Sequence, residues 1–247
     1  MMVVHILAVD DREFSINYHV ARKGFEYRGA EINIFHRREF DELILESGDI
    51  VIAGISLAHK AFSRLGLTEP FLPAIPKALA SFAGRKTWRS SIGDVRKRVS
   101  RGDPIFFKPA PSQPKLFTGL VANRVSDLVE TASLDDAAPV DCSEIVSFRS
   151  EYRCFILSGE VIGVRPYKGD PLLFPDGWRI REAVAAWADA PVAWALDVGV
   201  TTTNQTLLVE VNDSYALGSY GLPPARYAAM IEARWAELWA QRRQSQT

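Results

Sequence analysis

Apolar residues in the first fifty positions follow two alternating patterns. Short continuous apolar runs, typical of buried strands, lie at 3–9, 31–35 and 49–53, and segments with apolar residues at helical spacing lie at 12–23 and 38–45. Strand, helix, strand, helix, strand is typical of a small parallel α/β lobe. Three prolines between positions 70 and 76 interrupt this alternation, so we place the end of the lobe near Gly84.

The remainder of the chain is predicted to be richer in strands that follow one another directly. Helices are predicted at 86–101, 125–132 and 179–188, and Pro223 and Pro224 open a final amphipathic helix. Strands are predicted at 105–108, 120–125, 144–148, 152–157, 161–164, 192–199 and 206–211. The fourth and fifth of these strands are expected to form a hairpin with a three-residue loop at 158–160.

Composition narrows the class of protein without naming a function. The chain has 247 residues, 47% hydrophobic and 24% charged, with a formal net charge of −1. This is an ordinary globular composition, and it creates no global field that would recruit nucleic acid or an anionic membrane. No leader sequence and no apolar run of about 20 residues is evident, so we expect a cytoplasmic protein. Cys142 and Cys154 are too few for a disulfide framework and are expected to be buried free thiols.

Oxygen-donating side chains appear in the last predicted strand. Glu210 and Asn212 are two residues apart, so they point to the same side of a strand. Asp197, which also follows an apolar run, could add a third oxygen from the neighbouring strand. Magnesium prefers a few such oxygen ligands together with phosphate oxygens. The alternative is a plain turn at the strand end, in which Asn212 and Asp213 act only as caps.

Two lysines flank a proline-rich loop. Lys108 stands among bulky apolar residues, where an unpaired ammonium group is costly, and a polyphosphate would supply the missing negative charge. Lys115 precedes Leu-Phe-Thr-Gly119, and a glycine there allows the backbone to approach a phosphate closely. The alternative for each lysine is an ordinary surface residue whose aliphatic stem covers apolar neighbours.

Taken together, the order of these motifs resembles that of ATP-grasp ligases. The nearest resemblance is to the small ATP-grasp proteins formerly classed as a domain of unknown function, and the chain is more distantly similar to the ligases that add glutamate to a ribosomal protein. The matching motifs are, in order, Phe106-Phe-Lys-Pro109, Lys115-Leu-Phe-Thr-Gly119, Ser143-Glu-Ile-Val146, Glu151-Tyr-Arg153, Arg165 and Val209-Glu-Val-Asn212. The resemblance covers about residues 86–222.

The resemblance implies an α/β (α+β) ATP-grasp fold in three parts. These are an N-terminal parallel α/β lobe at 1–84, a small central lid lobe at 85–146, and a C-terminal lobe at 147–247 that is built on an antiparallel sheet and carries the metal site. Lys108 and Lys115 would hold the α- and β-phosphates of ATP from the lid.

The remaining roles implied by the resemblance surround the same nucleotide. Glu144, Ile145 and Val146 would form a hinge strand over the adenine, and Glu151 would either touch the ribose or orient Arg153. Arg153 and Arg165, which face each other across the hairpin, would bind the γ-phosphate or the substrate carboxylate. The metal ligands for Mg²⁺ would be Asp197, Glu210 and Asn212.

Such a site predicts a ligase that activates a carboxylate with ATP and Mg²⁺ and joins it, through an acylphosphate, to an amine nucleophile. The carboxylate could belong to a small molecule or a peptide. The loop after Asn212 departs from the family pattern, and Ser214, Tyr215 and Tyr220 would border the acceptor site. All four histidines lie in the first lobe and are expected to be structural or surface residues.

Two other classes of function remain open at this stage. The first is a nucleotide- or peptide-binding module that has lost turnover, although the phosphate- and metal-binding residue types occur together. The second is a nucleic-acid-binding protein that uses the basic stretch 85–101, which is more often a solvated helix face. We therefore expect neither a nucleic acid nor a membrane among the partners.

Overall fold

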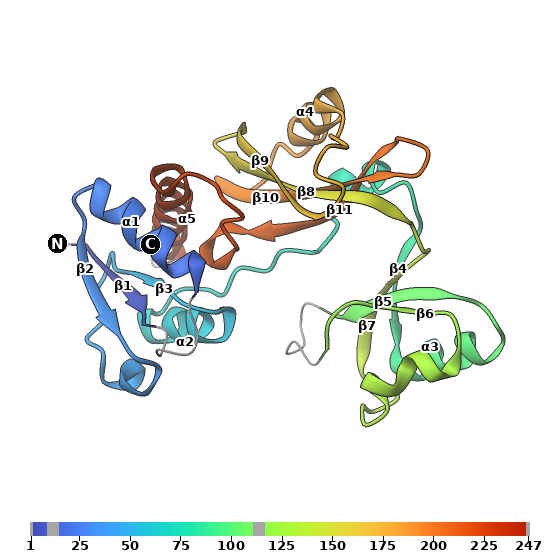
Figure 1. Cartoon of the computed structure of the whole chain (residues 1–247). Helices are drawn as coiled ribbons and strands as arrows, with labels where there is room; N and C mark the ends of the chain where they lie inside the picture. The colour runs from blue at the N-terminus through green and yellow to red at the C-terminus, as the bar shows by residue number, and fades with distance from the viewer. Residues whose placement is uncertain (1, 9–14, 111–116, 246–247) are drawn as a thin grey trace.

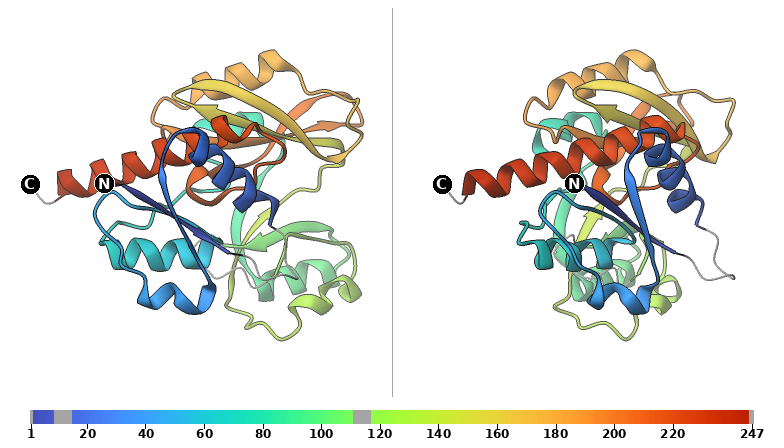
Figure 2. Two further views of the ribbon diagram at one scale, coloured as in Figure 1. Left: turned by 60° about the vertical axis from the view of Figure 1, so that its left-hand side comes forward. Right: turned by 90° about the vertical axis from the view of Figure 1, so that its left-hand side faces the viewer.

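A computed structural model describes residues 2–8, 15–110 and 117–245 of the chain. In this part of the chain the strands form three sheets, one after another in sequence. Figure 1 shows the N-terminal sheet at the left, the second sheet at the lower right and the third above it. The two views of Figure 2 keep this arrangement, with the third sheet above and the second below.

The N-terminal lobe is a parallel three-stranded sheet with helices, as the alternation predicts. Strand β1 (Val3–Leu7) lies between β2 (Glu31–Phe35) and β3 (Ile50–Ile52). The segment predicted as a helix at 38–45 is a short 3₁₀ helix, η1 (Arg37–Glu42), and a helix missed by the prediction, α2 (Ile55–Leu65), follows Gly54.

Helix α1 (Ile16–Tyr27) runs through Gly24 and ends before Gly29, which has a φ of 71°. Gly24 is needed for packing rather than for a turn, because a Cβ there would lie 2.1 Å from the carbonyl oxygen of Pro224. The backbone of α1 therefore lies directly against the start of α5 (Pro224–Ser245), the last helix of the chain.

The second sheet is antiparallel in every described pairing and has the order β4-β7-β5-β6. Its strands are β4 (Thr87–Ser91), β5 (Ile105–Pro109), β6 (Leu120–Ala122) and β7 (Pro139–Ser143), and its helices are α3 (Ile92–Ser100) and the 3₁₀ helix η3 (Val125–Thr131). The single helix predicted at 86–101 is wrong over its first third. Ser91 caps the backbone N–H of Asp94 at 3.3 Å, so the helix begins only after this serine.

The third sheet is antiparallel, with the order β11-β10-β8-β9. Its strands are β8 (Phe148–Leu157), β9 (Glu160–Gly169), β10 (Ala193–Thr201) and β11 (Thr206–Asp213). The predicted strand at 144–148 is wrong, because β7 ends at Ser143, β8 begins at Phe148 and the residues between them form a connection. The β8–β9 loop has two residues instead of three: Ser158 and Gly159 have φ of 52° and 77°, which suits the tightest hairpin turns.

One face of the third sheet packs against helix α4 (Gly177–Ala186) and the 3₁₀ helix η2 (Lys77–Phe82). Leu79 and Phe82 of η2 belong to this core, together with Tyr152, Trp194 and other residues of the sheet. The segment just before Gly84 thus packs under the third sheet.

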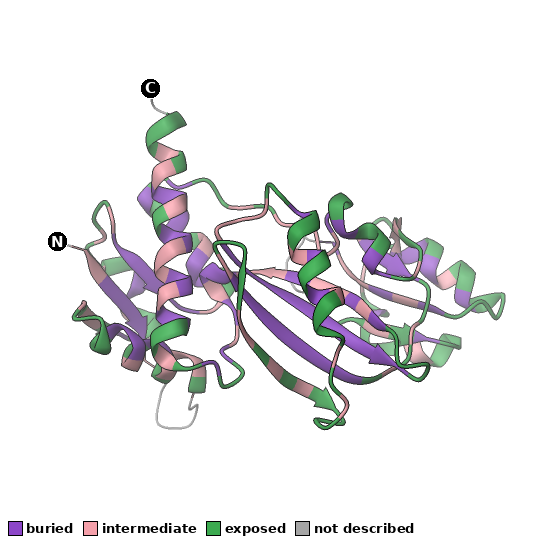
Figure 3. Ribbon diagram, turned by 90° about the horizontal axis from the view of Figure 1, so that it is seen from above, coloured by how far each residue is buried: buried purple, intermediate pink, exposed green. Residues whose placement is uncertain are grey.

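Helix α5 connects the N-terminal lobe to the third sheet. Its residues Trp235 and Trp239 share one core cluster with residues of β1, β3 and α2 and with Phe155, Ala193 and Ala195 of the third sheet. Trp239 Nε1 also donates to the backbone oxygen of Asp49 at 3.1 Å. Buried and exposed residues alternate along α5, as Figure 3 shows.

Cys142 and Cys154 are buried and free, as expected. Burial raises the pKa of the Cys142 thiol to about 12 and that of Cys154 further still, so neither is a reactive thiolate. Among the described residues, no helix combines the length and the apolarity needed to cross a bilayer.

Candidate active site

Four charged side chains form a row across the third sheet. Arg165 on β9 is paired in register with Arg153 on β8, Arg153 with Asp197 on β10, and Asp197 with Glu210 on β11. Residues directly opposite each other in antiparallel strands point to the same face. The row therefore lies on the face opposite to α4, two arginines on one side and two carboxylates on the other.

A β-bulge in β11 places Glu210 in this row. Asp197 is paired with Glu210, but its neighbour Val198 is paired with Leu208, so Val209 is the extra residue. Without the bulge, Leu208 and Glu210 would share one face, because side chains alternate along a strand. With the bulge, Leu208 is buried in the core beside α4 and Glu210 turns to the opposite face.

Arg153 and Asp197 form a buried, bidentate ion pair. Arg153 Nε donates to Asp197 Oδ1 at 2.8 Å and Arg153 Nη2 to Asp197 Oδ2 at 2.7 Å, and the two side chains are only 9% and 3% exposed. Burial alone would lower the pKa of Arg153, but the hydrogen bonds with Asp197 raise it. Burial raises the pKa of Asp197, against the effect of Arg153. Each group therefore depends on the other to keep its charge.

The predicted magnesium ligands lie together. Asn212 Nδ2 donates to Asp197 Oδ2 at 3.1 Å and to Glu210 Oε1 at 3.5 Å. No cluster of three or more His, Cys, Asp or Glu side chains with a metal-binding arrangement occurs in the described residues. The candidate set has two carboxylates and one amide, so it would need phosphate oxygens or water to complete the coordination of Mg²⁺.

Lys108, from β5 of the second sheet, reaches across to the third sheet and pairs with Glu210 Oε2. Burial alone would raise the pKa of Glu210, but the charge and hydrogen bond of Lys108 lower it. Lys115 lies outside the described residues. Only one of the two predicted phosphate-binding lysines is thus placed, and it lies directly beside the candidate metal ligands.

These groups border one cleft of about 840 Å³ between the second and third sheets. Its size is that of pockets that take cofactors or drug-sized ligands. The second sheet and the connection to the third contribute Phe106, Lys108, Thr118, Gly119, Val121, Ser143, Glu144, Ile145, Val146 and Ser147, and the third sheet and its loops contribute Phe148, Glu151, Arg153, Tyr167, Lys168, Asp197, Val209, Glu210 and Tyr220, with Arg85 beside them.

The predicted hinge residues line the cleft as an irregular connection. Glu144 Oε2 accepts from the backbone N–H of Lys86 at 2.9 Å, and the N–H of Glu144 donates to the backbone oxygen of Lys86 at 3.1 Å. These bonds hold the two chain segments between the sheets side by side. Ile145 and Val146 follow in the same connection, and both line the cleft.

Glu151 contacts neighbours that the sequence interpretation did not consider. It accepts from Tyr167 OH at 2.8 Å and from Lys168 Nζ at 2.6 Å. Both neighbours come from β9, where a bulge between the pairs of Glu151 and Tyr152 inserts Tyr167. The described contacts of Arg153 are instead with Asp197 and Tyr220, so of the two roles considered for Glu151, orienting Arg153 has no support in these contacts.

Tyr220 lies over Arg153, with the guanidinium carbon 4.7 Å from the ring centroid. Its φ of 41° is unusual for a residue other than glycine and is held between Gly218 and Gly221. Tyr167 packs beside it at a centroid distance of 5.4 Å. The glycines around Tyr220 were the only sequence signal for this pair of aromatic rings over the arginine.

Arg165 lies at the end of the charged row. Its Nε is buried and has no hydrogen-bond partner among the described residues. Unlike Arg153, it therefore has no carboxylate to neutralise it in the described part of the chain.

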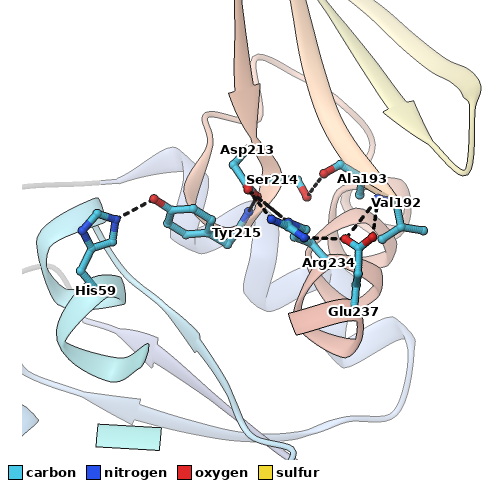
Figure 4. Close-up of polar contacts among 8 residues, drawn as sticks. All are labelled: His59, Val192, Ala193, Asp213, Ser214, Tyr215, Arg234 and Glu237. Atoms are coloured by element: carbon cyan, nitrogen blue, oxygen red, sulfur yellow. Dashed lines mark hydrogen bonds and ion pairs between the residues drawn. The ribbon is translucent and has the colours of Figure 1, made fainter. Parts of the chain in front are cut away.

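The loop after Asn212 is anchored away from the cleft, as Figure 4 shows. Asp213 accepts from Arg234 Nε and Nη2 at 2.9 and 2.7 Å and from the N–H of Tyr215 at 3.2 Å. Ser214 Oγ donates to the backbone oxygen of Ala193 at 2.8 Å, and Tyr215 OH lies 2.7 Å from His59 Nε2. Asp213 is thus a turn former. Ser214 and Tyr215 are buried, and neither lines the cleft described above.

Two sheets that close on a cleft, with a lysine on one sheet and carboxylates and arginines on the other, define the fold of the ATP-grasp ligases. The chain belongs to the ATP-grasp domain family: the model of the second family in one clade of these domains matches residues 82–230, more than half of the chain. No curated protein matches the sequence significantly.

Solved structures agree on the fold. The D-alanine–D-alanine ligase of Bacillus anthracis complexed with ATP is 12% identical, with 99% of each chain covered and a TM-score of 0.55. The macrocyclase MdnC of Microcystis aeruginosa, bound with precursor peptide MdnA, is 13% identical, with 94% of this chain and 99% of that chain covered and a TM-score of 0.54. The N5-carboxyaminoimidazole synthetase of Staphylococcus aureus complexed with ADP is 10% identical, with 94% and 77% covered and a TM-score of 0.59.

Proposed function

We propose that this protein is an ATP-dependent carboxylate–amine ligase that forms an amide bond and releases ADP and phosphate. The observation that carries the proposal is the meeting of opposite charges in one cleft: Lys108 from the second sheet contacts Glu210 at the end of the row that Arg165, Arg153 and Asp197 continue. Membership of the ATP-grasp family supports ATP as the source of the phosphoryl group.

The donor set fits magnesium and a polyphosphate. Asp197, Glu210 and Asn212 offer hard oxygen ligands on adjacent strands, which suits Mg²⁺ better than softer metals. The carboxylates now pair with Arg153 and Lys108, so cations already occupy the positions beside them. When bound, Mg²⁺-ATP supplies a phosphoryl group that converts a substrate carboxylate into an acylphosphate, which an amine then displaces with release of phosphate.

The side chains of this chain would divide the work between binding and positioning. Lys108 would exchange Glu210 for phosphate oxygens, because both are anions within reach of its ammonium group. Asp197 holds Arg153 in one orientation, whereas Arg165 has no described anionic partner. We therefore propose that Arg165 takes the acceptor carboxylate and that Arg153 stabilises the charge that develops at the γ-phosphate.

Closure of the second sheet on the third would keep water away from the reactive acylphosphate. We propose that the connection at 144–146 binds the adenine edge through its backbone, and that Lys115 joins Lys108 at the phosphates. The two carboxylate substrates suggested by similar structures, a small amino acid and a precursor peptide, are both compatible with an open-ended cleft.

The test is release of ADP from Mg²⁺-ATP in the presence of amino-acid pairs and short peptides. We expect Lys108→Ala and Glu210→Ala to abolish ADP release, because each removes one of the facing charges. Lys97→Ala and Glu182→Ala are matched controls, since both residues form exposed ion pairs within helices away from the cleft. Normal turnover by either cleft variant would refute the assignment.

One observation favours the alternative of a nucleotide- or peptide-binding module without turnover: Asp197 and Glu210 are both already neutralised by protein cations. Such a module would gain thermal stability from Mg²⁺-ATP but release no ADP with any substrate pair. Measuring both properties on one sample separates the two functions.

A further inference from the structure

Arg85 connects the second sheet to the bulge of the third. It lies in the segment between η2 and β4, where the chain enters the second sheet. Its Nη1 donates to the backbone oxygens of Ala83 at 3.0 Å and Leu208 at 2.7 Å, and its Nη2 donates to the backbone oxygen of Val209 at 2.9 Å. One guanidinium group thus holds two successive carbonyls of β11.

This contact depends on the bulge. In a regular strand, successive carbonyls point in opposite directions, so one side chain cannot bind both from the same side. The extra residue Val209 turns both carbonyls toward the free edge of β11, which is an edge strand of the sheet. These groups would otherwise lack a partner in the sheet, and Arg85 satisfies them.

The residue beyond Glu210 is fixed on the same edge. The backbone N–H of Val211 donates to the backbone oxygen of Ala74 at 2.8 Å. The carbonyls before Glu210 and the amide after it are therefore both held, and the carboxylate is aimed at Lys108 and Asp197. A lysine at position 85 could keep one of these bonds but not the planar fork that makes two.

We propose that Arg85 is a positioning residue that acts on metal binding by holding the Val209 bulge and so the direction of the Glu210 carboxylate. The inference rests on the proposed function, because it assigns Glu210 to Mg²⁺. It also makes the metal site sensitive to the segment through which the second sheet moves, since Arg85 belongs to that segment.

The experiment uses the full chain with Mn²⁺ as the metal probe and the non-hydrolysable nucleotide adenylyl imidodiphosphate. Mn²⁺ binding is followed by electron paramagnetic resonance and metal-free nucleotide binding by calorimetry. We expect Arg85→Lys to weaken Mn²⁺ binding roughly 10-fold, as loss of an outer-shell partner does, and to leave metal-free nucleotide binding within about 2-fold of wild type. Arg89→Lys is the matched control, because Arg89 lies in the same basic stretch but pairs with Asp141 and has no described bond to β11.

A double-mutant cycle separates positioning from a general structural role. In a Glu210→Gln background, Arg85→Lys should have no further effect on Mn²⁺ binding, because its action passes through that carboxylate. Additive losses, or equal weakening of metal-free nucleotide binding, would overturn the inference, as would wild-type Mn²⁺ affinity in Arg85→Lys. If Arg85→Lys lowers the melting temperature well below that of Arg89→Lys, the same measurements are made with Arg85→Gln. Failure of the wild type to bind either ligand would instead refute the proposed function.

Discussion

The buried pair of Arg153 and Asp197 allows the sharpest test of the electrostatics in the cleft, because the chain contains an exposed counterpart. Arg89 and Asp141 are also directly opposite each other on antiparallel strands, but their side chains are 51% and 26% exposed instead of 9% and 3%. Asp197→Asn and Asp141→Asn therefore remove the same charge from the same kind of pair at two different depths.

The expected magnitudes differ several-fold. Removing one partner of a buried pair leaves an uncompensated charge and costs about 3–5 kcal/mol, whereas an exposed pair contributes about 0–1 kcal/mol. For a chain of this size, 1 kcal/mol corresponds to about 2–4 °C. Asp197→Asn should thus lower the melting temperature by about 6–20 °C and Asp141→Asn by no more than about 4 °C.

The assay is urea unfolding without nucleotide, followed by tryptophan fluorescence. Trp187 and Trp194 pack edge to face at a centroid distance of 4.8 Å in the core of the third sheet, so their signal reports on the sheet that holds Asp197. The slope of free energy against urea should stay constant. If the two variants lose stability to within about 1 kcal/mol of each other, the pair is not buried as described and the reasoning fails.

Three further outcomes are expected. The stability that the Lys108–Glu210 pair contributes should be complete at about pH 7 and be lost as the pH falls below about 4.3, the ordinary pKa of glutamate, because the folded state lowers the pKa of Glu210; urea unfolding of wild type and Glu210→Gln across this range measures it. Tyr220→Gly should be about 0.5–1 kcal/mol more stable than Tyr220→Ala, the reverse of the usual order, because only glycine relieves the φ of 41°; a less stable glycine variant would argue against the strain. Mg²⁺-ATP at about 100 times its dissociation constant should raise the melting temperature of wild type and Lys97→Ala by about 5–10 °C, and no rise in either would contradict nucleotide binding.

Alternation along single strands made much of the third sheet predictable. Glu210 and Asn212 were placed on one side from their spacing alone, and the structure brings both to Asp197. The bulge at Val209 was not predictable in the same way, because a period of two would have put Leu208 on their side as well. Local sequence does not encode the pairing register that moves one residue out of step.

Contacts between distant segments were the other limit. Arg85 stands in a run of basic residues, and no local pattern distinguishes it from Arg89, yet it binds backbone more than 120 positions away. The strand β4 was hidden because Trp88, Ile92, Val95 and Val99 happen to match helical spacing, whereas pairing with β7 selects an extended backbone before Ser91. Tertiary partners decide such segments, and propensity alone does not.

The way α5 joins two lobes decides which parts of the molecule can move. Its tryptophans share one continuous apolar core with the N-terminal sheet and with Phe155 and Ala193, so separating those lobes would expose that core to water. The second sheet has its own core and is connected to the rest through two short strips of chain, near 83–86 and 144–147. Two lobes should therefore behave as one rigid body, against which the second sheet rotates about an axis that passes near Arg85 and Glu144.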